Sequence, residues 1–196
     1  MKPIIFSTYM VRKILSGEKT QTRRVVKPQP EVVKMGLSFR FIKHCHNQIC
    51  HPDEFPKIAA RYAPYKPGDV LWVRETWNFH PTEGYCFKVC NNGQVFCDDG
   101  SAKWRPSIYM PRSAARIFLK VTSVRVERVR DISINDCIKE GIENVHGFRS
   151  EIRNWYSEFW DSLNAKRGYS WESNPWCFVI SFEIVNHEEV VNHEMA

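Results

Sequence analysis

A short segment near the N-terminus brings together residue types that can bind an anion or catalyse acyl transfer. It contains an amine, two hydroxyls and two guanidiniums, supplied by Lys19, Thr20, Thr22, Arg23 and Arg24. Cations crowded into one turn repel one another, so a purely structural turn gains little from them, whereas an anionic ligand gains from each. The segment therefore predicts a binding or catalytic loop.

Two kinds of chemistry fit this loop. Neighbouring positive charge and burial both disfavour an ammonium ion, so Lys19 can act as a neutral base beside Arg23 and Arg24. A neutral amine can activate the hydroxyl of Thr22 for attack on an amide carbonyl, while an arginine stabilises the oxyanion or holds a phosphate. The alternative is a binding loop without turnover, in which Thr20 and Thr22 satisfy turn backbone groups.

Other polar side chains add to the candidate site. Glu75 follows an apolar run and is expected to point into a cleft, with an ion pair to Arg74 or another arginine as the alternative. Arg105, Arg112 and Arg116 are predicted to contact phosphate, although arginines near aromatic rings also form cation–π contacts within proteins. The nearby aromatic residues are predicted either to stack on a base or to pack in the core; they are Trp77, Trp104 and Tyr109.

Composition favours a soluble protein with an anionic partner. Lys and Arg exceed Asp and Glu by 28 to 22 in 196 residues, and basic residues outnumber acidic ones clearly between Arg12 and Lys34. That balance suits a phosphate-bearing partner, with a solvated basic face as the alternative. The N-terminus does not resemble a signal peptide and no long apolar run is present, so we expect a cytoplasmic protein without a membrane partner.

Cysteine usage predicts reduced thiols. The seven cysteines are odd in number and no export signal precedes them, which argues against a disulfide framework. His and Cys residues cluster at 44–51, and three further cysteines follow, Cys86, Cys90 and Cys97. Such ligands can close a zinc site, but the irregular spacing favours free thiols. We therefore predict no metal and no cofactor.

The elements that must position the loop can be read from periodicity. We expect a strand at 3–6 and a helix that begins at Ser7 or Thr8 and is terminated by Gly17, which leaves 19–24 in a loop before an extended segment at 25–27. Strands are predicted at 70–77, 117–126 and 176–185, and helices at 134–140 and 148–163. The second helix carries an aromatic stripe that we expect to lie in the core.

The remaining stretches, 31–65 and 80–103, lack clear periodicity and are predicted to be two long insertions. Turn pairs at Asn92-Gly93 and Asp99-Gly100 indicate a hairpin in the second. The absence of a βαβ rhythm and of a glycine-rich phosphate loop argues against a doubly wound nucleotide fold. We predict an α+β fold, a single domain over 1–196, with a small, mostly antiparallel β-barrel whose closure protects the strand edges.

Three segments resemble the ASCH domain family of the PUA-like superfamily. They are Ile-Leu-Ser-Gly-Glu-Lys-Thr-Gln-Thr-Arg-Arg at 14–24, Pro-Gly-Asp-Val-Leu-Trp-Val at 67–73 and Ile-Lys-Glu-Gly-Ile at 138–142. The segment at 104–112 resembles a branch common in bacteriophage and prophage genomes. The resemblance implies a small PUA-like β-barrel with flanking helices, and it leaves the two insertions uncovered.

The family resemblance also implies a cleft for RNA, a nucleotide or a modified base. Some members of the ASCH family are amidohydrolases that deacetylate N4-acetylcytidine. They use a lysine, a threonine three residues later and a glutamate on the second helix. Those positions match Lys19, Thr22 and Glu140. We therefore expect an RNA- or nucleotide-binding protein with a cationic cleft around Lys19–Arg24. The alternatives are an amidohydrolase, a binding loop in which Lys19 pairs with Glu140, and, more weakly, a phage protein-interaction module.

Overall fold

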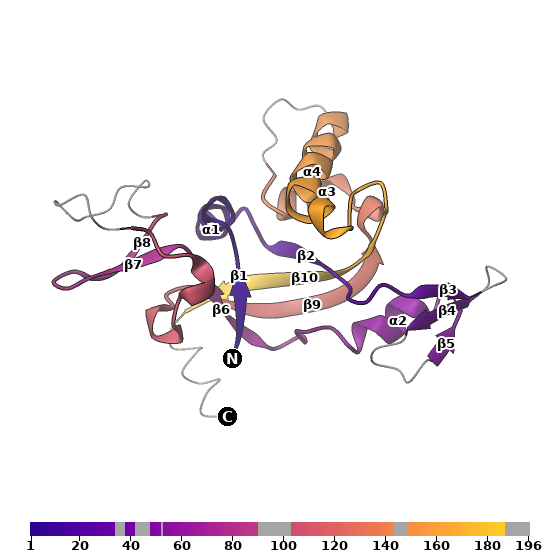
Figure 1. Ribbon diagram of the computed structural model, residues 1–196, viewed down its shortest axis with the longest axis horizontal. Helices are drawn as coiled ribbons and strands as arrows, with labels where there is room; N and C mark the ends of the chain where they lie inside the picture. Colours follow the sequence, from indigo (N-terminus) through magenta and orange to yellow (C-terminus); the bar gives the residue numbers. More distant parts are fainter. Residues whose placement is uncertain (34–37, 42–47, 52, 90–102, 143–148, 187–196) are drawn as a thin grey trace. The chain divides into compact units, whose positions relative to one another are not determined.

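The computed structural model describes residues 1–33, 38–41, 48–51, 53–89, 103–142 and 149–186 (Figure 1). The chain forms two compact units, each assembled from stretches that are distant in sequence. Unit 1 comprises Met1–Thr20, Pro67–Val121 and Phe182–Ala196. Unit 2 comprises Gln21–Lys66 and Thr122–Ser181.

Helices and strands both contribute, so the predicted α+β class is confirmed. The largest sheet has five strands in the order β1-β6-β9-β10-β2. Strand β1 (Lys2–Ile5) runs parallel to β6 (Val70–Arg74), and β6 runs antiparallel to β9 (Phe118–Arg128). Strand β10 (Trp176–Val185) runs antiparallel to β2 (Gln21–Val25). The long strands β9 and β10 contribute residues to both units.

The described strands of this sheet are not closed into a barrel, which differs from the prediction. Strands β1 and β2 stand at the two ends of the strand order. Closure was expected because open apolar edges invite pairing with other chains. These edges have other protection, since β1 contains Pro3, which lacks a backbone donor, and β2 is rich in polar and charged residues.

In unit 1, helix α1 (Thr8–Leu15) confirms the helix predicted before Gly17. The hydroxyl of Ser7 caps it by accepting a hydrogen bond from the Met10 backbone N–H, and Val11 and Ile14 are fully buried. Gly17 then adopts a positive φ of 76°, a conformation that glycine reaches without steric cost. The helix therefore ends where the sequence predicts.

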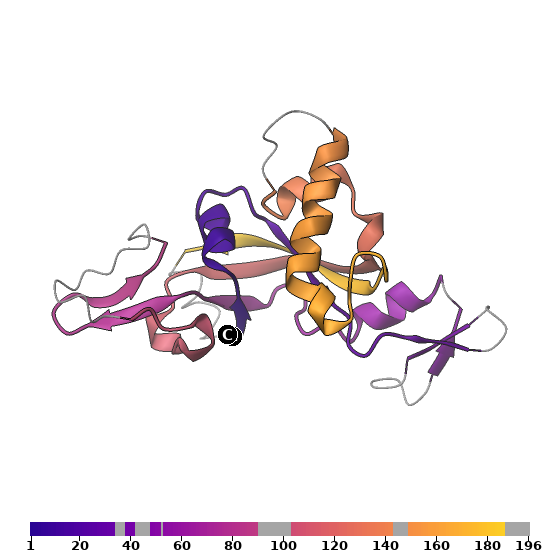
Figure 2. The ribbon, with the colours of Figure 1, turned by 45° about the horizontal axis from the view of Figure 1, so that its top comes forward.

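The strand predicted at 70–77 ends earlier than expected. Strand β6 ends at Arg74, and Trp77 begins the first strand of a β-hairpin in unit 1. Strand β7 (Trp77–His80) pairs antiparallel with β8 (Gly84–Phe87), so part of the predicted second insertion is ordered as a two-stranded ribbon (Figure 2). The predicted turns at Asn92-Gly93 and Asp99-Gly100 lie outside the described residues. Two short 3-10 helices, η1 (Ser107–Tyr109) and η2 (Arg112–Ala114), come next along the chain.

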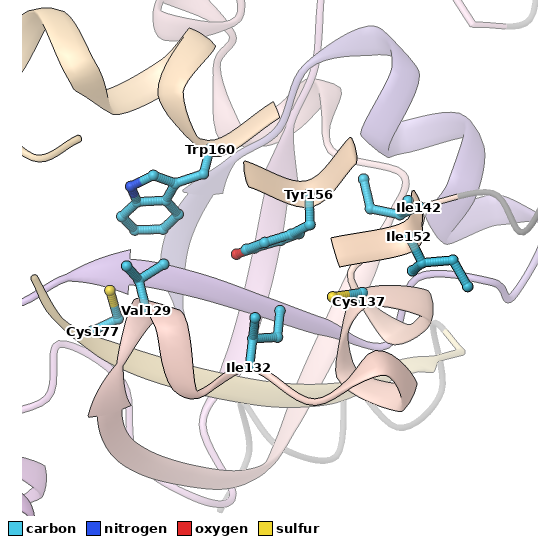
Figure 3. Close-up of a cluster of buried hydrophobic side chains, with 8 residues drawn as sticks. All are labelled: Val129, Ile132, Cys137, Ile142, Ile152, Tyr156, Trp160 and Cys177. Carbon is cyan, nitrogen blue, oxygen red and sulfur yellow. The ribbon is translucent and has the colours of Figure 1, made fainter. Parts of the chain in front are cut away.

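In unit 2, helices α3 (Ile134–Lys139) and α4 (Arg149–Asn164) cover one face of β2 and β10 (Figures 1 and 2). Two further 3-10 helices lie here, η3 (Val129–Asp131) and η4 (Ala165–Arg167). The predicted aromatic stripe of α4 enters the core through Ile152, Tyr156 and Trp160, whereas Trp155 and Leu163 are exposed. Figure 3 shows this core, which also contains Val129, Ile132, Cys137, Ile142 and Cys177.

The predicted first insertion, 31–65, contains regular structure. Strands β3 (Glu31–Val33), β4 (Ser38–Phe41) and β5 (Gln48–Cys50) form an antiparallel sheet, and helix α2 (Phe55–Ala60) follows. Phe55 and Ala59 are fully buried, and the Phe55 ring centroid lies 4.9 Å from that of Trp176. This stretch therefore contributes to the packing of unit 2. Throughout the described residues, no helix is both long and apolar enough to cross a membrane.

Candidate functional site

The residues predicted to form a loop after α1 are divided between a short connection and a strand. Lys19 and Thr20 precede β2, whereas Thr22, Arg23 and Arg24 lie within it and pair with β10, with Arg23 opposite Val179. The loop prediction is therefore wrong for residues 21–24, because pairing with β10 satisfies the backbone of this polar segment. Successive side chains of a strand point to opposite faces, so Arg23 shares a face with Gln21, and Thr22 and Arg24 belong to the other.

Arg23 is the centre of a buried hydrogen-bond network in unit 2. Its Nε and Nη2 donate to Glu127 Oε1, and its Nη1 donates to Gln21 Oε1 at 2.9 Å and to Glu140 Oε1 at 3.0 Å. A fifth bond runs from Nη2 to Asp136 Oδ2 at 3.2 Å. A guanidinium has five N–H donors, so each donor of Arg23 has a protein acceptor. Arg23 therefore serves as an internal anchor of unit 2.

The charges around Arg23 keep it protonated although its side chain has no exposed surface. Burial alone would lower its pKa, but the negative charges of Glu140 and Glu127 act in the opposite direction and the net effect raises it. The guanidinium also lies 6.0 Å from the centroid of the Tyr156 ring, a cation–π distance. Burial raises the pKa of the Tyr156 phenol well above its ordinary value, and the Glu140 charge adds to this effect.

The outer part of the network reaches solvent. Arg125 Nε donates to Glu127 Oε2 at 2.9 Å, and Arg125 Nη2 donates to Asp136 Oδ2 at 2.6 Å. The Arg125 side chain is 42% exposed. The network, defined as Arg23, Arg125, Glu127, Asp136 and Glu140, contains two guanidiniums and three carboxylates, a formal charge of −1.

The three residues matched to the amidohydrolase pattern are all buried, with exposed fractions of 3% for Lys19, 4% for Thr22 and 3% for Glu140. Lys19 belongs to unit 1, where its Nζ lies 5.7 Å from the centroid of the Phe6 ring. Thr22 and Glu140 belong to unit 2, where Glu140 is the C-cap residue of α3 and pairs with Arg23. The half-buried Thr20 accepts a hydrogen bond from the Phe182 N–H through its carbonyl.

Glu75 adopts the ion-paired alternative, with Arg116 as its partner. Arg116 Nε donates to Glu75 Oε1 at 2.8 Å, and Arg116 Nη2 donates to Oε2 at 2.9 Å. Glu75 is almost fully buried, and the same guanidinium lies 4.2 Å from the Phe87 ring centroid. A bidentate pair of this kind fixes both side chains, so Glu75 serves as an anchor inside unit 1.

Of the three arginines predicted to contact phosphate, Arg116 pairs with Glu75, and Arg105 and Arg112 are exposed on unit 1. Arg105 forms an isolated β-bridge with Trp77, and its guanidinium lies 5.0 Å from the Trp77 ring centroid. The cation–π alternative is therefore observed for Arg105, whose exposed side chain still faces solvent. Of the aromatic residues predicted to stack or pack, Trp77 is buried, Trp104 is half-buried and Tyr109 is largely exposed.

Comparison with protein-family models and with curated proteins finds no match. Two solved structures resemble the chain. A DUF984-family protein from Enterococcus faecalis V583 is 12% identical with a TM-score of 0.41, covering 89% of this chain and 65% of its own. An ASCH domain from Lactobacillus crispatus JV V101 is 13% identical with a TM-score of 0.37, covering 91% of this chain and 71% of its own. This chain therefore spans less than two thirds of the length of the first structure. The ASCH family resembled by the sequence motifs thus appears among the structural neighbours, and the phage branch stays a prediction.

Sequence reasoning missed three members of the Arg23 network. Arg125 and Glu127 lie two residues apart on β9 and therefore share a face, and Asp136 lies in the first turn of α3. A buried arginine needs carboxylate partners, and this requirement is the sequence signal for Glu127 and Asp136.

The described residues contain no group of three or more potential metal ligands from the His, Cys, Asp and Glu side chains. Cys86 is half-buried, whereas Cys50 is buried and His51 is exposed. Five members of the predicted His and Cys clusters lie outside the described residues, namely His44, Cys45, His46, Cys90 and Cys97.

Proposed function

We propose that unit 2 binds RNA or a nucleotide through a basic surface, and the distribution of charge carries this proposal. The sequence ranges of unit 2 contain 17 Lys and Arg against 12 Asp and Glu, a net +5, whereas those of unit 1 contain 11 and 10, a net +1. The Arg23 network takes three of the carboxylates and two of the guanidiniums of unit 2, so its other side chains carry +6. Such a surface attracts a polyanion.

Within unit 2, we assign the proposed contact to the half-buried Arg24 and the exposed Arg167. Burial lowers the pKa of Arg24, whereas Tyr65, Glu140 and Tyr156 act in the opposite direction, and the positive charge of Arg167 makes a smaller contribution that lowers it. Two guanidiniums close enough to repel each other are both stabilised when an anion binds beside them. Of the arginines predicted for the cleft, the proposal therefore retains Arg24 and substitutes Arg167 for Arg23. In this proposal the phosphate binds to unit 2.

A titration of labelled single-stranded RNA at several salt concentrations tests this proposal. Each lost phosphate contact should reduce the slope of log affinity against log salt by about 0.7. We therefore expect Arg167→Ala and Lys27→Ala, both at exposed positions, to flatten the slope. Lys120→Ala removes the same charge from an exposed position of unit 1 and should leave the slope unchanged. Wild-type affinity that does not depend on salt would contradict the proposal.

A second candidate function, hydrolysis of an N4-acylated cytosine nucleoside, is favoured by the burial of Lys19, Thr22 and Glu140. Buried ionisable residues are costly to a fold and are concentrated in active sites. In this proposal the Thr22 hydroxyl loses its proton to an amine base and attacks the amide carbonyl, and the base then passes the proton to the leaving amino group. Glu140 is held by Arg23 on the face of β2 opposite to Thr22, so it acts by fixing the strand in place and not by transferring the proton. Water then releases acetate from the threonine ester and regenerates the hydroxyl.

Mass detection of cytidine after incubation with N4-acetylcytidine tests the second function. Wild-type turnover should disappear in Lys19→Ala and Glu140→Gln, provided that far-ultraviolet circular dichroism shows both variants folded. Lys120→Ala is the matched lysine control and should retain full activity. Absence of turnover in the wild type would exclude this substrate and leave the nucleic-acid proposal intact, since RNA affinity is measured separately.

A further inference from the structure

One face of the β7–β8 hairpin is a row of aromatic side chains. The register pairs Trp77 with Phe87 and Phe79 with Tyr85, and directly paired residues of antiparallel strands share a face. Trp77 and Phe79 lie two positions apart on β7, so all four rings belong to the same face. We call these four residues the aromatic row.

The inner half of the aromatic row is covered and the outer half is open. Trp77 packs with Met110 and Ala114, and Phe87 packs against this cluster. Phe79 is 48% exposed and Tyr85 is 38% exposed. The covered rings therefore anchor the hairpin, while the two outer rings present apolar surface to solvent.

Contacts within unit 1 hold the outer rings in place. The Tyr85 centroid lies 5.8 Å from that of Trp77 and 5.4 Å from that of Phe79, the latter pair meeting edge to face at 69°. The Tyr85 hydroxyl is hydrogen-bonded to Ser113 Oγ at 3.0 Å. Rings fixed in this way lose little conformational freedom when a planar ligand stacks on them.

The surroundings of the aromatic row are basic. Residues 77–89 and 103–116 contain five basic side chains and one acidic side chain, Glu83, and one of the five, Arg116, is paired with Glu75. Arg105 and Arg116 contact the two inner rings directly, at 5.0 Å from the Trp77 centroid and 4.2 Å from the Phe87 centroid. Exposed rings combined with guanidiniums suit a ligand that offers both flat apolar surfaces and negative charge.

We infer that the aromatic row stacks unpaired bases of single-stranded RNA on Phe79 and Tyr85, with Arg105 and Arg112 beside the phosphates. Base stacking on aromatic side chains next to arginines is a general mode of single-strand binding, because every base has an aromatic face. Bases of a duplex are stacked on one another and cannot use such a row. This inference rests on the proposed nucleic-acid binding and adds a base-recognition surface on unit 1 to the phosphate contacts of unit 2.

Phe79→Ala and Tyr85→Ala test the inference with single-stranded RNA that carries 2-aminopurine, whose fluorescence falls on stacking. We expect each variant to bind about tenfold more weakly and to lose most of the fluorescence quenching. Tyr85→Phe keeps the ring and removes only the bond to Ser113, so it should retain quenching. Trp155→Ala removes an aromatic side chain of unit 2 that is 58% exposed and should bind as the wild type does.

The outcomes separate the two proposals. If the wild type binds RNA with the expected salt dependence and Phe79→Ala and Tyr85→Ala bind equally well, the stacking inference is wrong and the row is left for a protein partner. Equal losses of affinity for single-stranded RNA and for a duplex of the same length would also contradict it. If the wild type binds no RNA, the proposed function fails and the stacking inference falls with it.

Discussion

Replacement of Arg23 by leucine should destabilise unit 2 far more than loss of any exposed arginine. The substitution removes the hydrogen bond that Arg23 donates to the Glu140 side chain, which is 4% exposed, and the bonds that Glu127 and Asp136 accept from Arg23. Breaking a buried ion pair by removing one partner costs about 3–5 kcal/mol, because an uncompensated charge stays buried. Glu127 and Asp136 keep their bonds to Arg125 and reach solvent, so the lower end, about 3 kcal/mol, is expected.

Urea unfolding followed by tryptophan fluorescence measures this loss. Arg125→Ala is the matched control, since Arg125 contacts the same two carboxylates from a side chain that is 42% exposed, and it should cost about 0.5 kcal/mol. A loss below about 1 kcal/mol for Arg23→Leu would refute the reasoning, since it would mean that water solvates the network.

Two further predictions concern the rest of the fold. Burial raises the pKa of the Cys137 thiol from 9.0 to about 11. The unfolded chain therefore releases this proton first, so the stability contributed by Cys137 is complete below pH 9 and is lost as the pH rises toward 11. Unfolding free energies across that range check the direction, and a Cys137→Ser variant should show a weaker decline. Gly17→Ala should cost about 1 kcal/mol because its φ of 76° strains any side chain, although no atom lies within 4 Å of an added Cβ. Gly17→Asn should cost less than Gly17→Ala, because asparagine adopts a positive φ more readily than alanine. Equal losses of stability for the two variants in thermal unfolding would contradict this explanation.

Local periodicity was sufficient to predict most elements of the framework. Strand β10 has the predicted bounds, α1 is capped by Ser7, one of the two predicted start residues, and α3 begins at the predicted Ile134. Each of these segments combines a clear apolar period with a start or stop signal. Where the pattern was mainly polar, as in β2, the strand depends on pairing with a partner about 155 residues away, which no local pattern reveals.

The candidate site was harder to predict than the framework, because residue type does not distinguish a ligand-binding arginine from an internal one. Arg23 and Arg24 are neighbours with the same chemistry, yet a strand sends them to opposite faces. Arg23 uses its donors on acceptors contributed by β9 and α3, which are more than 100 residues away in sequence. The role of Arg23 therefore depends on tertiary contacts. Only the acceptors that it contacts in the folded protein identify it as an internal residue.

The two proposed contributions to RNA binding differ in how they respond to salt, which allows one series of titrations to resolve them. Phosphate contacts of Arg167 and Lys27 release counterions, so their loss changes the slope of log affinity against log salt. Stacking on Phe79 and Tyr85 displaces no counterions, so its loss should lower affinity equally at every salt concentration and leave the slope unchanged. A ring variant that changed the slope would show that the hairpin acts by orienting its arginines, and parallel lines would show that the rings themselves bind the bases.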